Sequence, residues 1–150
     1  MNQYIIKITC IINEGRRTCA DVLIKKGRIE KIAPSIDTKE KCIEIIGRDR
    51  FLLPGAIDDQ VHFREPGLTH KATIYTEAKA AVAGGVTSFM EMPNTQPPAF
   101  THALLEDKYE IGKRTSLANY SFFMGTSNDN IEEVLRTNER KNDICGVKVF

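Results

Sequence analysis

The sequence predicts an α/β protein in two parts, a strand-rich segment over residues 1–53 and alternating strands and helices over residues 54–150. The first part consists of short, isoleucine-rich runs separated by glycine turns, which is typical of strands joined by hairpins. In the second part, β-branched apolar runs alternate with runs of helical spacing, which favours βα units around a parallel sheet. We therefore predict a small β-sandwich segment followed by the first half of a (β/α)8 TIM barrel.

Five short strands are expected in the first part. Glycine-bearing turns at residues 13–15 and 25–27 suit tight hairpins between the first three strands. The segment carries no cluster of catalytic residue types, so its expected role is structural. The predicted strands span residues 4–12, 18–24, 28–33, 42–46 and 51–53.

The second part should contain three βα units and the beginning of a fourth. The predicted helices cover residues 71–83, 101–114 and 131–140, and the predicted strands cover 56–64, 86–92, 117–124 and 145–150. A complete (β/α)8 barrel needs about 250 residues. We therefore expect a portion of a longer enzyme, truncated in strand 4. Its open sheet edge argues against stable folding in isolation.

The composition is that of an ordinary globular protein, with 27% charged residues, 41% hydrophobic residues and a net charge of +1. The near-neutral charge gives no argument for nucleic-acid binding. No apolar run approaches the ~20 residues of a membrane helix, and the first residues lack a secretory signal. We therefore expect a cytoplasmic protein without membrane partners. The four scattered cysteines lack a C-x-x-C spacing, which favours reduced thiols.

The densest group of chemically active residues lies in Leu53–Gly67, LPGAIDDQVHFREPG. In an extended strand, Asp58, Gln60, His62 and Arg64 share one face. Burying unpaired charges costs several kcal/mol, so such a face needs a metal, a substrate or water. A half-buried strand with a solvated polar face explains the pattern equally well, so periodicity alone leaves both interpretations open.

This stretch resembles the signature of the cyclic amidohydrolases, and most closely that of the dihydroorotases, Pro-Gly-x-Ile-Asp-x-His-x-His-x-Arg-Glu-Pro-Gly. The resemblance implies a metal-dependent barrel enzyme, preceded by a β-sandwich, that interconverts dihydroorotate and N-carbamoyl-L-aspartate in pyrimidine biosynthesis. It implies that His62 is a zinc ligand and that Arg64 binds the substrate carboxylate. A surface salt bridge, for example with Glu65, is the alternative role for Arg64.

Gln60 departs from the family pattern, because it stands where relatives have the first histidine of their metal pair. Glutamine is a neutral and weak oxygen ligand. Three outcomes are open: a site with one metal, a site with two metals of altered affinity, or a protein that has lost catalysis.

Two further residues resemble family site positions. Asn94, in Met92-Pro93-Asn94-Thr95, resembles the second contact to the substrate carboxylate, although asparagine is also common in turns. Lys148 lies among apolar residues of the fourth predicted strand. Its stem can reach water, or, as in the hydantoinases and some dihydroorotases that it resembles, it is carboxylated and bridges two metal ions. His70 and His102 are expected at the surface, and His70, which is close to the motif, also stays open as a site residue.

Relatives take further histidines and a general acid/base from later strands, so the catalytic acid/base is expected beyond residue 150 and the isolated chain should be inactive. The expected cofactor is zinc, one or two ions, and the expected partners are a small-molecule substrate and further copies of the protein in a homo-oligomer. The alternatives are a hydantoinase or allantoinase, and a non-catalytic homologue that acts as a structural partner.

Overall fold

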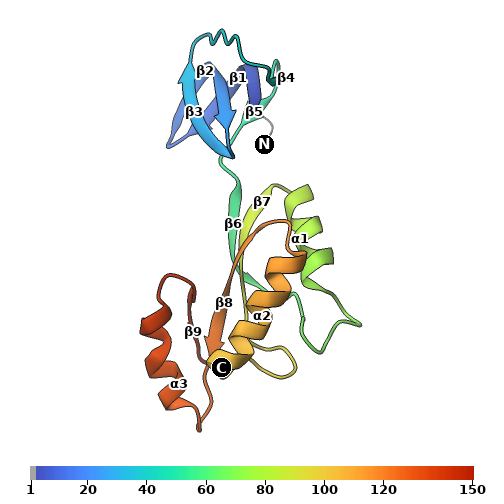
Figure 1. Ribbon diagram of the computed structural model, residues 1–150, viewed down its shortest axis with the longest axis vertical. Helices are drawn as coiled ribbons and strands as arrows, with labels where there is room; N and C mark the ends of the chain where they lie inside the picture. The colour runs from blue at the N-terminus through green and yellow to red at the C-terminus, as the bar shows by residue number, and fades with distance from the viewer. Residues whose placement is uncertain (1–2) are drawn as a thin grey trace. The chain divides into compact units, whose positions relative to one another are not determined.

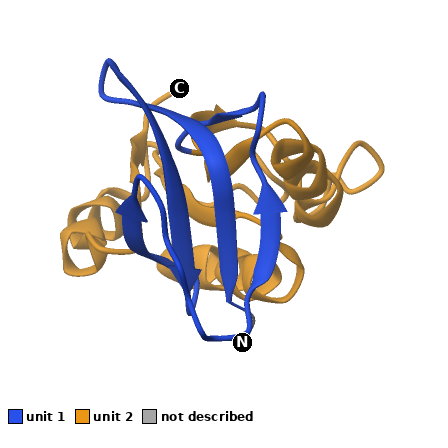
Figure 2. Cartoon of the chain, turned by 90° about the horizontal axis from the view of Figure 1, so that it is seen from above, with its two compact units in different colours: residues 1–54 blue, residues 55–150 orange. Residues whose placement is uncertain are grey.

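The computed structural model describes residues 3–150, and the chain forms two compact units, Met1–Pro54 and Gly55–Phe150 (Figures 1 and 2). The N-terminal unit is all β. The C-terminal unit is a parallel sheet with helices beside it. This is the α/β class that the alternating pattern of the sequence predicted.

The N-terminal unit contains one mixed sheet in the order β3-β2-β1-β4, with β5 beside β1. Strands β1 to β3 are antiparallel neighbours, whereas β4 and β5 run parallel to β1. Residues 3–54 contain no second sheet, so the two-layered sandwich stays a prediction. The strands are β1 (Tyr4–Asn13), β2 (Arg16–Lys25), β3 (Arg28–Ala33), β4 (Ile43–Ile46) and β5 (Phe51–Leu52).

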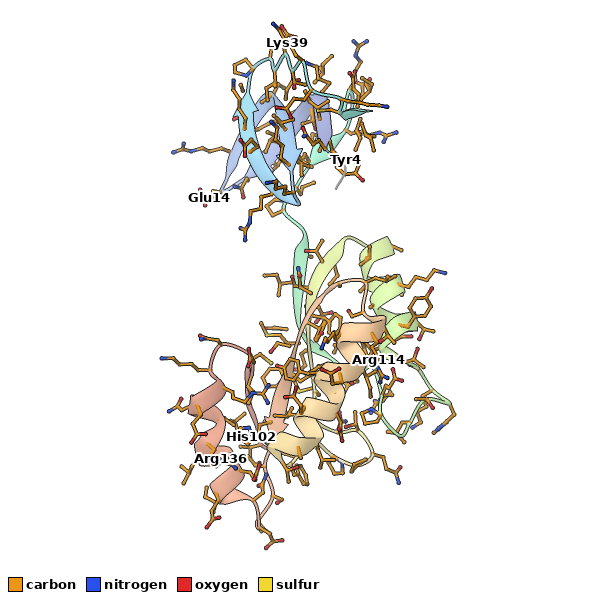
Figure 3. All side chains as sticks on the ribbon, in the orientation of Figure 1. Tyr4, Glu14, Lys39, His102, Arg114 and Arg136 are labelled. Atoms are coloured by element: carbon orange, nitrogen blue, oxygen red, sulfur yellow. The ribbon has the colours of Figure 1, made fainter. Side chains whose placement is uncertain are left out.

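Both hairpins of this unit turn through two residues with positive φ. The values are +49° and +70° at Glu14 and Gly15, and +52° and +75° at Lys26 and Gly27. Figure 3 labels Glu14 at the first turn. Two positive φ angles define the type I′ turn that matches the twist of antiparallel strands. The glycine positions in the sequence therefore set both hairpins.

Asp21 is a buried anchor of the N-terminal unit, with 2% of its surface exposed. Lys7 Nζ lies 2.6 Å from its Oδ2, and the backbone N–H groups of Ile8 and Ile36 donate to the two carboxylate oxygens at 2.8 and 2.9 Å. Burial would raise the pKa of Asp21, but these hydrogen bonds outweigh it and hold the pKa below its ordinary value. The carboxylate thus fixes the irregular part of β1, where the register shifts.

The C-terminal unit has the strand order β6-β7-β8-β9, all parallel, and Figure 1 shows α1 and α2 beside this sheet. Three βα units and a fourth strand occur as predicted. No helix among residues 3–150 is long and apolar enough to span a membrane. The elements are β6 (Ala56–Val61), α1 (Ile74–Ala83), β7 (Val86–Glu91), α2 (His102–Thr115), β8 (Asn119–Gly125), α3 (Ile131–Leu135), a 3₁₀ helix η1 (Arg136–Arg140) and β9 (Gly146–Lys148).

Helix starts follow local capping. Thr73 accepts a hydrogen bond from the N–H of Thr76, and Thr101 accepts one from the N–H of Leu104. Because Thr73 caps α1, this helix begins three residues later than predicted. The two helices close an apolar core whose fully buried members are Ile74, Ala78, Phe89, Ala99, Leu105, Phe122 and Met124.

Candidate functional site

The candidate residues lie at or just beyond the carboxyl ends of three of the four parallel strands. His62 and Arg64 follow β6, Asn94 follows β7, and Lys148 is the last residue of β9. Because the strands are parallel, these ends share one edge of the sheet. In barrels of this kind that edge carries the active site.

Strand β6 is shorter and less regular than predicted. It ends at Val61 rather than residue 64, and its pairing with β7 shifts between Asp58 and Val61. Arg64 has a φ of +69°. The prediction that Asp58, Gln60, His62 and Arg64 share one face required a regular strand up to Arg64. The strand ends before that residue, so this requirement is not fulfilled. On the strand itself Ile57 is 65% exposed, whereas Phe63, just beyond its end, is buried.

His62 and Asn94 are joined by a hydrogen bond between the ends of β6 and β7. The distance from His62 Nδ1 to Asn94 Oδ1 is 2.8 Å. An amide oxygen can only accept, so Nδ1 of His62 is the donor of this hydrogen bond, and in a neutral imidazole with that proton Nε2 is the nitrogen that keeps a lone pair. This is the arrangement in which a partner of one ring nitrogen orients the other nitrogen toward a metal. The amide Nδ2 of Asn94 keeps its own donors.

The loops that follow β6 and β7 interlock through their backbones. The N–H of Gln96 donates to Pro66 O at 3.1 Å. Gly67 has a φ of +81°, and a Cβ atom there would lie 1.8 Å from Gln96 O. The peptide bonds before Pro66 and Pro97 are both cis. Glycine at position 67 is therefore required both by its conformation and by the approach of the second loop.

Arg64 does not pair with Glu65. Glu65 Oε2 instead accepts from the N–H of Ile74 at 2.8 Å, at the first turn of α1. The backbone O of Arg64 accepts from the N–H of Leu68 at 3.0 Å, which holds the left-handed turn. The ion pairs among the described residues do not include Arg64. The alternative of a salt bridge with Glu65 is therefore wrong.

Lys148 is held by its backbone. Its carbonyl accepts from Thr126 N at 3.0 Å and from Thr126 Oγ1 at 3.1 Å, and its register partner is Gly125. Its Nζ lies 5.6 Å from the ring centroid of Phe150, and no carboxylate of residues 3–150 is in salt-bridge distance. The structure shows no contact between Lys148 and His62, whose strands are separated by β7 and β8.

Residues 3–150 do not by themselves supply a full set of ligands for a metal ion. No group of three or more His, Cys, Asp or Glu side chains among residues 3–150 could hold an ion. Zinc sites take three or four protein ligands. His62 fits one of these positions through its free Nε2, and the exposed Gln60 offers only an amide oxygen.

A buried ion pair supports the end of β7, and the sequence analysis missed it. Glu91 and Lys108 are 0% and 1% exposed, and Lys108 Nζ lies 2.8 Å from Glu91 Oε2. Lys108 also donates to Met92 O at 3.2 Å and lies 4.8 Å from the ring centroid of Phe122. A glutamate at the end of an otherwise apolar strand was the available signal.

Burial dominates the ionisation of this pair. It raises the pKa of Glu91 and lowers the pKa of Lys108, while the attraction between the two charges opposes both shifts. The backbone N–H groups of Arg64 and Phe63 also lower the pKa of Glu91. Neither carboxylate oxygen of Glu91 makes a hydrogen bond of acceptable distance and angle with any of the described residues. The short Nζ–Oε2 separation is thus a charge contact rather than an aligned hydrogen bond.

His102 lies at the start of α2 (Figure 3), and its hydrogen bonds go to Glu133 rather than to any of the four candidate residues. Its backbone N–H donates to Glu133 Oε2 at 2.6 Å, and its ring Nε2 lies 3.1 Å from Glu133 O. His70 is exposed. A hollow of about 450 Å3 lies between Tyr109, Tyr120 and residues 141–145, and none of the four candidate residues lines it.

Parallel βα units with polar residues at the carboxyl ends of the strands are typical of barrel enzymes. The chain belongs to the amidohydrolase family, whose family model matches residues 51–146. It is 47% identical to a dihydroorotase of Carboxydothermus hydrogenoformans over 89 residues, 59% of this chain and 20% of that protein. It is 32% identical to an allantoinase of Solibacter usitatus over 100% of this chain and 32% of that protein.

Solved structures share the fold. The L-hydantoinase (dihydropyrimidinase) of Arthrobacter aurescens superposes with a TM-score of 0.89 at 24% identity, over 98% of this chain and 32% of that chain. A dihydropyrimidinase of Brevibacillus agri gives 0.82 at 24% identity, over 99% of this chain and 33% of that chain. The chain spans between a fifth and a third of the length of these relatives.

Proposed function

We propose that the protein is a metal-dependent hydrolase of cyclic amides, of the dihydroorotase type, which interconverts dihydroorotate and N-carbamoyl-L-aspartate in pyrimidine biosynthesis. The observation that carries the proposal is the 2.8 Å contact between His62 and Asn94, the residues proposed as a metal ligand and a substrate contact. The 47% identity to a dihydroorotase supports the substrate class.

Arg64 and Asn94 are proposed to bind the carboxylate of the substrate. The planar fork of arginine matches a carboxylate, and the free Nδ2 of Asn94 adds a donor beside it. Asn94 would have two roles, because its Oδ1 also sets the tautomer of His62. The left-handed turn at Arg64 and the interlocked loops keep these groups in place before the substrate binds.

His62 and Lys148, the latter as a carbamate, are proposed to hold zinc together with ligands from the remainder of the enzyme. Zinc held there would supply a bound water of lowered pKa and a Lewis acid for the ring carbonyl. Whether one or two ions bind depends on Gln60, which replaces an imidazole by an amide. We further propose a cytoplasmic, homo-oligomeric enzyme.

A related ring opener, a hydantoinase or allantoinase, is the second candidate. The 37% identity to an allantoinase of Deinococcus radiodurans over 81% of this chain favours it. Arg64 and the Asn94 turn favour an acidic ring instead, since a neutral ring offers no carboxylate to bind.

A third candidate is a non-catalytic homologue that acts as a structural partner of another enzyme. Gln60 is the residue that supports it, because the loss of an imidazole weakens the metal site. Turnover of any cyclic amide by the full-length protein would exclude this candidate.

A substrate panel with the full-length protein separates the three candidates. We expect dihydroorotate and N-carbamoyl-L-aspartate to be interconverted, with kcat/KM at least about tenfold above the values for hydantoin and allantoin. A preference for a neutral ring would support the second candidate. Absence of turnover for all rings, with no bound metal, would support the third.

A further inference from the structure

Cys10 and Cys19 face each other on neighbouring strands of the N-terminal unit. They are register partners in the antiparallel pair β1–β2. The N–H of Cys10 donates to Arg50 O at 3.3 Å, on the side of β1 away from β2. The two cysteines therefore form a non-hydrogen-bonded pair, in which Cα atoms lie about 4.5 Å apart and the side chains are closest. This separation is within the range of disulfides, about 4.4–6.8 Å.

A basic hollow surrounds the two thiols. Its volume is about 420 Å3, and both cysteines line it together with Arg17, Arg48 and Arg50. Asp49 is the one acidic side chain among its lining residues, so the excess charge is positive. Cys19 is exposed and Cys10 is half-buried. The hollow thus contains the accessible thiol of Cys19 and, next to it, the less accessible thiol of Cys10.

Arg17 is the basic residue of the hollow that directly contacts a cysteine sulfur. Its Nε donates to Cys10 Sγ at 2.9 Å, and its guanidinium lies 5.4 Å from the ring centroid of Phe51. The contact places a fixed positive charge next to one of the two sulfur atoms. Carboxylates of an incoming molecule would meet the same positive charge.

We propose that Cys10 and Cys19 form a dithiol site for small acidic disulfides, of which glutathione disulfide is the representative. The thiolate of Cys19 attacks one sulfur of the disulfide, which releases the first glutathione as a thiolate. The thiolate of Cys10 then attacks the Cys19 sulfur of the mixed disulfide, which releases the second glutathione. The two cysteine protons end on the two glutathione molecules, so the protein loses two electrons and glutathione disulfide gains them.

The other two cysteines serve as internal controls. Cys42 lies elsewhere in the N-terminal unit, with its Sγ directed at Gln3 Oε1 over 3.8 Å. Cys145 lies in the C-terminal unit, where burial raises the pKa of its thiol and so disfavours the thiolate. Neither has a cysteine as its strand-register partner.

The test uses the reduced full-length protein, treated with glutathione disulfide, quenched by alkylation and mapped by peptide mass spectrometry. We expect a Cys10–Cys19 cross-linked peptide to appear before any modification of Cys42 or Cys145. The Cys10→Ser variant should instead keep glutathione on Cys19. The proposal is wrong if Cys19 remains alkylated as a free thiol, or if wild type retains glutathione there without the cross-link.

The charge requirement has its own test. Wild type should react at least about tenfold faster with glutathione disulfide than with the cationic disulfide cystamine, because a basic hollow attracts anions. Arg17→Gln and Arg48→Gln should reduce this preference, whereas Arg28→Gln on β3 should leave it unchanged. Equal rates for the two disulfides in wild type would overturn the acidic class. These readouts do not depend on hydrolase activity.

Discussion

The contact between His62 and Asn94 joins the ends of two neighbouring strands through their side chains. The asparagine lies in a Pro-Asn turn, yet its Oδ1 fixes the proton of His62 on Nδ1. The turn and functional roles that the sequence left open for Asn94 are compatible, since its position in the turn brings the amide to the imidazole. One residue thereby links the metal and substrate parts of the proposed site.

Replacement of Arg64 by alanine should weaken binding of the acidic substrate. Hydrogen bonds to a charged group contribute about 1.5–3 kcal/mol, so kcat/KM for dihydroorotate should fall about 10- to 100-fold, mainly through KM. Activity toward a neutral ring should change little. Steady-state kinetics of the full-length protein check this, and an equal loss for both substrates would remove the carboxylate role from Arg64.

Replacement of Gly67 by alanine should separate the two loops. The left-handed conformation costs about 1–2 kcal/mol with a side chain, and the contact with Gln96 O adds to that cost. Gly85→Ala is the matched control, because Gly85 also has a positive φ, +91°, but a Cβ atom there would meet nothing within 4 Å. Thermal unfolding should show a larger loss for Gly67→Ala, and equal losses would contradict the interlocking of the loops.

At the scale of secondary-structure elements, the sequence indicated where strands and turns lie better than it indicated which elements contact each other. Glycine turns indicated the two hairpins and the β-branched runs indicated the parallel strands. The shift in β6 and the pairing of Glu91 with Lys108 depend on which strands and helices meet, and the local sequence does not specify this. The facing of Cys10 and Cys19, by contrast, follows from the register that the two-residue turn at Glu14 and Gly15 sets. The sequence indicated that His62 and Asn94 follow neighbouring strands, but it did not indicate that their side chains are hydrogen-bonded.

Removing one residue of the Glu91–Lys108 pair should strongly lower the stability of the protein, whereas replacing both by apolar residues should lower it little. Removing one partner leaves a buried uncompensated charge, which costs about 3–5 kcal/mol. Lys108→Met and Glu91→Met should therefore each lower the unfolding midpoint strongly, while the double variant should recover most of the loss. Denaturant unfolding of the three variants measures this, and additive losses would contradict a coupled pair.

An exposed pair on the same helix provides the comparison. Lys113 and Glu110 lie 3.1 Å apart with side chains 69% and 51% exposed. Exposed pairs contribute about 0–1 kcal/mol, so Lys113→Met should change the midpoint little. A loss as large as that of Lys108→Met would indicate a general effect of altering α2.

Asp21 should make the N-terminal unit sensitive to acid. Its pKa in the folded protein is below the unfolded value of about 3.9. The stability that it contributes is therefore complete above that value and is lost as the pH falls through the lower folded pKa. Unfolding between pH 5 and pH 2.5 should show this loss in wild type and a smaller one in Asp21→Asn. Equal acid dependence in both, with the exposed Glu30→Gln as control, would contradict the anchor role.

For the whole molecule, the fold and the family are consistent with each other, and His62, Arg64 and Asn94 all lie within the matched region 51–146. Residues 3–150 contain no group of three or more His, Cys, Asp or Glu side chains that could hold a metal ion, so the proposed zinc site needs ligands besides His62. The proposed activity therefore belongs to the full-length protein, in which other strands would complete the site.

Metal content is the most direct test of the proposed site. The full-length protein should bind at least one zinc ion per chain by elemental analysis, and His62→Ala should lose zinc at a given chelator concentration where wild type retains it. Asn94→Ala should fall between the two, because His62 would lose its orienting partner. Equal zinc retention in wild type and His62→Ala would contradict the assignment of His62 as a ligand prepared by Asn94.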